Sequence, residues 1–378
     1  MRHPSFSGGF NYHKEEFMKK LLIGFIYLLL IVGGLGIALA DDDDDGAVRT
    51  FVTLPDGVRF PEGIAANPAN GDIYVATFDF GPNANTLLRY NRRGRLLARL
   101  DFKGTPLLGL IFEPVQQKVY IANVGNLAGA GAAKVQRVPA DFDSNTSIED
   151  VANIPVIGAP GPRTEGNPDG SNDTITFGSN SAPAPNAFEF DKLGNLYVSD
   201  SFQGAVFRIA DVKGCALPCP VTTLVQDPLL ATAGFPPFGA NGLAFNGDNS
   251  ALFIANTGDD RILKFDMATK VVSVFAESIN GADGIVFDRR GRLWVAANQN
   301  DEVVALNANG RPIVRLGEFE GIDRDGAPKG LLFPASPVIV GNEMFVTNLA
   351  LPLTPAAGDE PEEDVTRWTV SRIKLRRH

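Results

Sequence analysis

The chain has 378 residues, of which 44% are hydrophobic, and it contains 40 glycines and 26 prolines. This composition excludes a disordered chain and predicts a globular protein with a large core and frequent turns. The net charge of −10 at neutral pH argues against nucleic acid as a partner.

The first 46 residues do not have the character of a folded domain. Two lysines precede an apolar run that begins at Leu21, and Ala38-Leu39-Ala40 precedes five aspartates, which is the layout of a secretory signal. We expect 1–40 to be an upstream segment and signal peptide, 41–46 an acidic spacer and 47–378 one domain. The protein is then exported, to the periplasm or to the medium. The apolar run nearly has the length that spans a bilayer, so an uncleaved anchor is the alternative.

A four-residue strand pattern of apolar, aromatic, β-branched and small residues predicts the fold. Each copy follows an apolar strand and a tight turn, and a further strand comes after it. Repeats of four strands in about 40 to 50 residues are typical of propeller blades. We therefore expect an all-β, six-bladed β-propeller with four-stranded blades, closed by an N-terminal strand at 48–54. The six copies are 73–76, 119–122, 196–199, 252–255, 293–296 and 344–347.

Aligning the blades on this pattern exposes the residue that opens each innermost strand. Innermost strands line the central channel of a propeller, so these positions converge on the axis. Two carboxylates and two amides there make an oxygen cage that suits Ca²⁺, with Mg²⁺ as a second choice. The alternative is that such residues only satisfy turns at strand starts. The six residues are Glu62, Leu108, Asn186, Asn241, Asp283 and, approximately, Ser336.

Polar residues also end the repeated strand, which runs back toward the same end of the propeller. They are candidates for orienting the metal ligands, and a solvated strand terminus is the alternative for each. These candidates are Asn123, Asp200, Asn256 and, one place further along its blade, Asn298.

The cysteines and histidines limit the chemistry. Cys215 and Cys219 are the only cysteines, and a short disulfide loop is the expected arrangement in an oxidising compartment. A metal site there is the alternative, although two thiolates make only half of a zinc site. The three histidines lie in the leader (His3 and His13) or at the last residue (His378), which excludes a Ser-His-Asp or Cys-His mechanism.

The segments around the four polar positions resemble the gluconolactonase and regucalcin (senescence marker protein) family. That family consists of six-bladed propellers with a catalytic calcium ion on the axis, and its members hydrolyse lactones. The resemblance implies a metal-ligand role for Glu62, Asn186, Asn241 and Asp283, and a role as base or nucleophile for Asp283. The matching segments are Pro61-Glu62-Gly63-Ile64, Pro185-Asn186, Ala240-Asn241-Gly242-Leu243 and Ala282-Asp283-Gly284-Ile285.

Three residues depart from the patterns of related enzymes. Ala184 stands where sugar-lactone members of the family have an arginine, which puts a phosphorylated or hydroxyl-rich lactone in doubt. Gly63 and Ala187 stand where the related paraoxonases have acidic residues that hold a second calcium ion. We therefore expect a single ion.

The expected function is a calcium-dependent hydrolase of lactones or related esters, in which the ion polarises the carbonyl group. The protein would act as a monomer on a small molecule, with no membrane partner unless the leader is retained as an anchor. A non-enzymatic propeller of the NHL-repeat kind, binding a ligand or protein, is the alternative. A strictosidine-synthase-like propeller ranks below both.

Three connections are expected to border the metal face. The long loop 158–184 is a candidate lid or a disordered segment. Residues 227–238 and 321–333 border the same mouth. Within the first of them, Phe235 and Phe238 either form an apolar wall for the substrate or pack onto the blades beneath.

Overall fold

The computed structural model describes residues 46–80, 85–125, 133–178, 182–354 and 356–375. The predicted signal peptide, its alternative as a membrane anchor, and all of the acidic spacer except Gly46 lie outside the described residues. Within the described ranges, no helix is long and apolar enough to cross a membrane.

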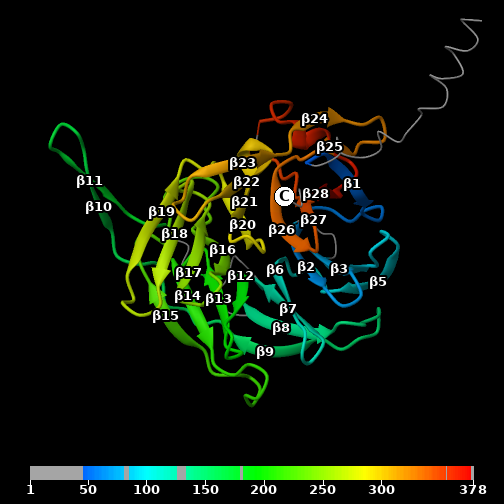
Figure 1. Cartoon of the computed structure of the whole chain (residues 1–378), viewed down its shortest axis with the longest axis horizontal. Coiled ribbons are helices and arrows are strands. Elements are labelled where there is room, and N and C mark those ends of the chain that lie inside the picture. The colour runs from blue at the N-terminus through cyan, green and yellow to red at the C-terminus, as the bar shows by residue number, and fades with distance from the viewer. Residues whose placement is uncertain (1–45, 81–84, 126–132, 179–181, 355, 376–378) are drawn as a thin grey trace, which may run out of the picture. The chain divides into compact units, whose positions relative to one another are not determined.

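Six four-stranded antiparallel sheets stand around one axis, which confirms the predicted all-β, six-bladed propeller (Figure 1). In every blade the repeated pattern forms the second strand. Blade 1 contains β2 (Pro61–Asn67), β3 (Asp72–Thr77), β4 (Thr86–Tyr90) and β5 (Leu96–Asp101), and blade 2 contains β6 (Leu107–Glu113), β7 (Lys118–Asn123), β8 (Lys134–Pro139) and β9 (Glu149–Asn153). Blade 3 contains β12 (Pro185–Phe190), β13 (Leu196–Asp200), β14 (Ala205–Ile209) and β15 (Thr222–Gln226), and blade 4 contains β16 (Ala240–Phe245), β17 (Ala251–Asn256), β18 (Arg261–Asp266) and β19 (Val272–Glu277).

The ring closes where the sequence predicts that it closes. Blade 5 contains β20 (Ala282–Phe287), β21 (Leu293–Ala297), β22 (Glu302–Leu306) and β23 (Pro312–Leu316). Blade 6 contains β26 (Pro334–Val340), β27 (Glu343–Asn348), β28 (Thr369–Lys374) and, as its outermost strand, β1 (Val48–Thr53) from the other end of the chain. The two ends of the domain are therefore hydrogen-bonded together in one sheet, which closes the ring.

Among the described residues, two hairpins and two short 3₁₀ helices lie outside the blades. The helices are η1 (Asn298–Asn300) and η2 (Pro361–Asp364), and the hairpins are β10 (Arg163–Gly166) with β11 (Asn172–Ile175) and β24 (Phe319–Ile322) with β25 (Pro328–Gly330).

In blades 1 to 4 the aromatic residue of the repeated strand packs the blade against the next one. Its ring meets the aromatic residue near the end of the first strand in the following blade, and such aromatic pairs add to the energy of apolar burial. The ring centroids are 6.1 Å apart for Tyr74 and Phe112, 5.7 Å for Tyr120 and Phe190, 5.0 Å for Tyr197 and Phe245, and 5.3 Å for Phe253 and Phe287. The core is therefore a series of layers between neighbouring blades.

Each innermost strand carries a register shift directly after its first residue. The pairing moves from Pro61↔Thr77 to Ile64↔Val75 in blade 1, and the other five blades shift at the equivalent place. Such irregularities re-aim a side chain, here that of the second residue in the strand. In blade 6 the shift lies between Pro334 and Pro337, so the equivalent residue is Ala335 and the predicted Ser336 is wrong by one position.

Small residues after these positions let neighbouring innermost strands approach closely. A Cβ atom added to Gly63 would lie 2.2 Å from Leu108 O, and one added to Gly242 would lie 2.4 Å from Asp283 O. Real Cβ atoms do not reach such distances, so the glycines are a packing requirement of the narrow channel.

Two predicted features lie away from the axis. Cys215 and Cys219 are joined by a disulfide, as predicted, in the connection between β14 and β15. The candidate lid 158–184 instead contains the β10–β11 hairpin, which projects away from the ring (Figure 1). Arg163 of the hairpin donates a 3.1 Å hydrogen bond to Asp259 of blade 4.

Candidate functional site

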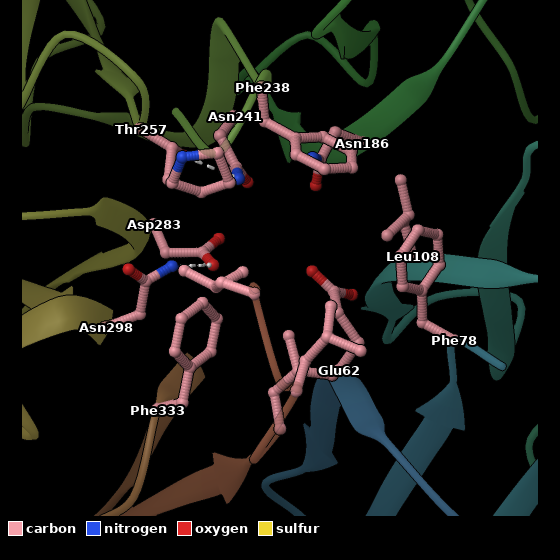
Figure 2. A pocket seen from close by; sticks show the side chains of 14 residues that line it. Glu62, Phe78, Leu108, Asn186, Phe238, Asn241, Thr257, Asp283, Asn298 and Phe333 are labelled. Atoms are coloured by element: carbon pink, nitrogen blue, oxygen red, sulfur yellow. Dashed lines mark hydrogen bonds between the residues drawn. The ribbon is translucent and has the colours of Figure 1, made fainter. Parts of the chain in front are cut away.

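Four side chains from four different blades meet in one cavity on the propeller axis. Glu62, Asn186, Asn241 and Asp283 all line it and point into the same space (Figure 2). All four are buried, with at most 5% of their surface exposed. The register shift described above directs each of them inward. The structure therefore brings together the four candidate ligands that the repeat alignment selects.

Hydrogen bonds fix which end of each amide faces the cavity. The Ser201 hydroxyl donates to Ala240 O at 2.7 Å, so it is free to accept a bond from Asn186 Nδ2 at 3.0 Å. The Thr257 hydroxyl donates to the backbone of blade 5 in the same way and accepts from Asn241 Nδ2 at 2.9 Å. One N–H of each amide is therefore engaged outside the cavity, and Oδ1 of each can face a cation, although the Asn241 amide also hydrogen-bonds Asp283.

The two carboxylates are buried and only partly satisfied. Asn298 Nδ2 donates to Asp283 Oδ2 at 3.1 Å. Asp283 Oδ1 and Glu62 Oε2 are buried oxygens without a hydrogen-bond partner among the described residues. Burial raises the pKa of Asp283 to about 7, although the bond from Asn298 acts in the opposite direction. Burial, and then the charge of Asp283, raise the pKa of Glu62 well above its usual range.

These observations fit a hard divalent cation. A buried carboxylate oxygen without a partner is costly, and a cation between Glu62 and Asp283 removes that cost for both. The amide oxygens of Asn186 and Asn241 complete a set of four oxygen ligands, of the kind that Ca²⁺ prefers. The described residues contain no cluster of three or more histidine, cysteine or acidic side chains, so a metal here depends on the amides.

Only one of the four candidate orienting residues contacts the ligands. Asn298 holds Asp283, as described above. Asn123 Nδ2 donates to Gln136 within blade 2, and Asn256 Nδ2 donates to the backbone of Leu229 and Ala231. Asp200 accepts hydrogen bonds from the backbone of Ala184 and of the turn that follows β13. These three satisfy loops and do not line the cavity.

Ser201 and Thr257 are functional candidates that the sequence reading missed. Ser201 directly follows Asp200 at the end of β13, and Thr257 directly follows Asn256 at the end of β17. Asn298 occupies the same place after β21 in blade 5. In these three blades the residue that contacts a candidate ligand is therefore the one directly after the end of the second strand. It lies one position later than the polar strand-end residues predicted from the sequence. In the three other blades this position is Phe78, Val124 and Leu349, so one side of the ring is polar and the other apolar.

Apolar side chains from several loops cover the quartet. Of the predicted pair, Phe238 lines the cavity whereas Phe235 is 57% exposed and does not. Phe333, at the end of the predicted 321–333 border, also lines it. No described residue of the candidate lid 158–184 does so. The complete apolar lining is Phe78, Leu108, Pro236, Phe238, Phe333, Leu349, Leu351 and Leu353.

The cavity is small in this arrangement. Its volume of about 30 Å³ accommodates an ion with one or two water molecules. A larger ligand can reach the quartet only if some of the apolar side chains above it move. Leu351 and Leu353 lie in the irregular segment between β27 and η2, where no sheet hydrogen bonds restrain them.

Comparison with known families supports the predicted resemblance. Residues 235–317, which include Asn241 and Asp283, match the SMP-30/gluconolactonase/LRE-like region. This part of the chain is similar to that family. The match covers blades 4 and 5, which contain two of the four quoted motifs. No curated protein matches the sequence.

Solved structures share the fold at low sequence identity. A luciferin-regenerating enzyme has a TM-score of 0.57 at 15% identity, covering 85% of this chain and 94% of its own. The calcium-binding protein regucalcin from Agrobacterium tumefaciens has a TM-score of 0.54 at 15% identity, covering 86% and 96%. A gluconolactonase from Xanthomonas campestris has a TM-score of 0.52 at 15% identity, covering 87% and 89%. At this identity the similarity establishes the fold.

Proposed function

We propose that this protein is a calcium-dependent hydrolase of lactones or related esters. The observation that carries the proposal is the pair of unpartnered, buried carboxylate oxygens on Glu62 and Asp283, beside two amides whose oxygens are left for the same cavity. A scaffold alone gains nothing from this arrangement, because burying unpaired polar atoms is destabilising. The family match over 235–317 favours lactone chemistry.

Each residue of the site has a distinct part in the proposed reaction. Glu62, Asn186, Asn241 and Asp283 would hold the ion, which supplies the positive charge that polarises a carbonyl oxygen. Asp283 would also take a proton from an attacking water, because its Oδ1 is a buried carboxylate oxygen without a partner beside the proposed ion. Asn298 keeps the Asp283 carboxylate in one orientation through its hydrogen bond.

The lining of the cavity favours an apolar substrate. A sugar lactone needs hydrogen-bond partners for its hydroxyl groups, and above the quartet the lining consists of the apolar side chains named earlier. Thr257 and Asn298 are polar, but Thr257 is engaged with Asn241 and Asn298 with Asp283. We therefore propose that the substrate carries an alkyl or aryl group next to the reacting carbonyl, and few hydroxyl groups.

The experiment is an activity panel on the purified protein. It compares γ- and δ-lactones with alkyl chains, aryl esters and gluconolactone, each with calcium, with chelator, and after calcium is restored. Hydrolysis of the apolar lactones or aryl esters that is lost with chelator and regained with calcium supports the proposal. Bound calcium without hydrolysis of any substrate would instead favour the non-enzymatic alternative, for which the small volume of the cavity is the supporting observation.

Export and a monomeric state are the remaining parts of the proposal. Export is proposed from the sequence of the leader, and a monomeric state is proposed because the sequence predicts no protein partner. N-terminal sequencing of the protein from its native source, with light scattering of the same sample, tests both. A mature chain that starts at Asp41 is the expected result.

A further inference from the structure

One position has the same backbone hydrogen bond in all six blades but a different side chain in each. It directly follows the second strand, and we call it the strand-exit position. Its backbone N–H donates to the carbonyl two residues before the aligned inward-facing residue, as from Ser201 to Ala184 O at 3.0 Å. What differs between the blades at this position is therefore the side chain. The six donors are Phe78, Val124, Ser201, Thr257, Asn298 and Leu349, with bonds of 2.9 to 3.4 Å.

In blades 3 to 5 the side chain at this position matches the ligand of the blade. The two amide ligands, Asn186 and Asn241, lie in the two blades that have a hydroxyl there. In blade 5, where the ligand is the carboxylate of Asp283, the position has the amide donor Asn298. The two oxygens of a carboxylate are equivalent, whereas an amide has an oxygen at one end and an NH₂ group at the other. An amide ligand therefore needs a partner that distinguishes its two ends.

The Ser201 hydroxyl distinguishes the two ends because its single proton is already used. It donates to Ala240 O at 2.7 Å and accepts from Asn186 Nδ2 at 3.0 Å. Thr257 makes the same two bonds in blade 4, at 2.8 Å and 2.9 Å. Both residues are buried, with at most 2% of their surface exposed. A hydroxyl that has given its proton to a carbonyl can only accept, so each amide must turn its NH₂ group toward it.

These hydroxyls also connect neighbouring blades. The carbonyl that accepts from Ser201 belongs to the residue directly before Asn241, and the one that accepts from Thr257 belongs to the residue directly before Asp283. A series of hydrogen bonds therefore runs from the ligand of blade 3 to the ligand of blade 5. Hydrogen bonds in such networks reinforce one another, so the three ligands are held as a unit.

The two amides are not held equally. The Asn241 amide hydrogen-bonds Asp283 as well as Thr257, so it keeps one partner when the hydroxyl is removed. Among the described residues, the Asn186 amide has Ser201 as its one hydrogen-bond partner. The terminal torsion of asparagine has a broad, roughly two-fold profile, so an amide without a partner turns over easily. It then presents N–H groups to the cavity, and a cation is repelled by them.

We infer that Ser201 and Thr257 are positioning residues, whose hydroxyls hold the amide oxygens of Asn186 and Asn241 toward a bound cation, and that calcium affinity depends more on Ser201 than on Thr257. Groups that orient metal ligands in this way typically change metal affinity by about 10- to 100-fold. The inference rests on the cation site of the proposed function but not on hydrolysis.

The test is a calorimetric titration of the folded full chain with calcium, after treatment with chelator. Ser201→Ala and Thr257→Val remove one hydroxyl each, and valine already occupies the strand-exit position of blade 2. The dissociation constant for calcium should rise about tenfold or more in Ser201→Ala and by a smaller factor in Thr257→Val. Melting temperatures in chelator measure separately how far each change destabilises the fold.

Three further variants separate positioning of the ligands from stability of the fold. Ser201→Thr and Thr257→Ser keep the hydroxyl and should retain the calcium affinity of the wild type. Thr77 is 1% exposed, as Thr257 is, and its hydroxyl accepts from Thr86 N at 2.9 Å within blade 1. It does not line the cavity, so Thr77→Val should lower the melting temperature but leave calcium affinity unchanged.

Four results would overturn the inference: wild-type affinity in Ser201→Ala, an equal loss of affinity in Thr77→Val, a larger loss in Thr257→Val than in Ser201→Ala, or a Ser201→Thr variant that binds as weakly as Ser201→Ala. A wild-type protein that binds no calcium would overturn it together with the proposed function. Calcium binding without hydrolysis of any substrate would reject the hydrolase alone, and a loss of affinity in Ser201→Ala would then still support positioning by the hydroxyl.

Discussion

The side-chain amide of Asn298 donates a 3.1 Å hydrogen bond to Asp283 Oδ2, and both side chains are buried beside the propeller axis. Because Asp283 opens the innermost strand of blade 5 and Asn298 follows the second strand, the pair lies across one hairpin. The bond leaves Asp283 Oδ1 as the oxygen that faces the cavity without a partner. The proposed metal site depends on this oxygen and on Glu62 Oε2, the other buried carboxylate oxygen without a partner.

Replacing Asp283 by asparagine should abolish hydrolysis. The variant keeps the shape of the side chain but loses the base and one negative charge, so kcat should fall about a hundredfold or more. Initial rates at saturating calcium measure this. Asp200→Asn is the control, since Asp200 is equally buried but bonds to loops outside the cavity. A rate per folded molecule that is unchanged in Asp283→Asn, with calcium still bound, contradicts the assignment.

Replacing Glu62 by glutamine should act mainly on the ion. The set of four ligands keeps an oxygen at this position but loses one of its two negative charges. The number of charged ligands is a main determinant of calcium affinity. The apparent dissociation constant for calcium should rise about tenfold or more, while kcat at saturating calcium changes little. Calcium titrations of activity separate the two effects. Unaltered calcium dependence would remove Glu62 from the ligand set.

Replacing Asn298 by alanine should shift the pH dependence of hydrolysis. The hydrogen bond from Asn298 favours the ionised form of Asp283, so its removal raises the pKa of that carboxyl further. At a fixed calcium concentration below saturation, the acid limb of the activity profile should therefore move to higher pH. Asn123→Ala is the matched control, because Asn123 ends the equivalent strand of blade 2 and bonds to Gln136 away from the ligands. Equal profiles for the two variants would mean that Asn298 only supports the fold.

Calcium affinity should itself depend on pH near neutrality. Burial raises the pKa of Asp283 to about 7, and below that value a proton must leave before the carboxylate can bind the ion. The apparent affinity should therefore fall by at least about tenfold for each pH unit below 7, and more steeply where Glu62, whose pKa burial also raises, must lose its proton as well. Calorimetry in buffers of different ionisation enthalpy also counts the proton released. Constant affinity between pH 5 and 8 would contradict the assignment of Asp283 as a ligand.

Removing one of the apolar side chains that line the cavity should change which substrates are hydrolysed fastest. Phe238→Ser removes a side chain that lines the cavity, whereas Phe235→Ser changes an exposed phenylalanine of the same loop. We expect kcat/KM for a long-chain lactone to fall about tenfold in Phe238→Ser, with little change for an unsubstituted lactone. Phe235→Ser should behave as the wild type with both. A parallel loss for the two lactones would show that Phe238 does not contact the substituent.

Much of the fold could be predicted because each blade repeats the same local pattern. The aromatic residue of the repeated strand packs on the next blade, so the sequence period reports the blade period directly. The position of the ligands followed from the same alignment. Blade 6 was misplaced by one residue because Ala335 is neither polar nor followed by glycine, and nothing in the sequence marks the register shift there.

The residues around the ligands were harder to predict. Ser201 and Thr257 matter through hydrogen bonds to the backbone of the next blade, a relationship that a single repeat does not reveal. Leu351 and Leu353 belong to an irregular connection without periodicity, so their approach to the axis depends on tertiary packing alone. The long 158–184 loop has the composition of a lid, yet its described residues form a hairpin and do not line the cavity.

The most direct measurement of the central claim is a calorimetric titration of the purified protein with calcium, after treatment with chelator. The account predicts one ion bound per chain, and binding that is lost when Glu62→Gln and Asp283→Asn are combined in a folded protein. A wild-type protein that binds no divalent ion, or a double variant that binds calcium as tightly as the wild type, would contradict it.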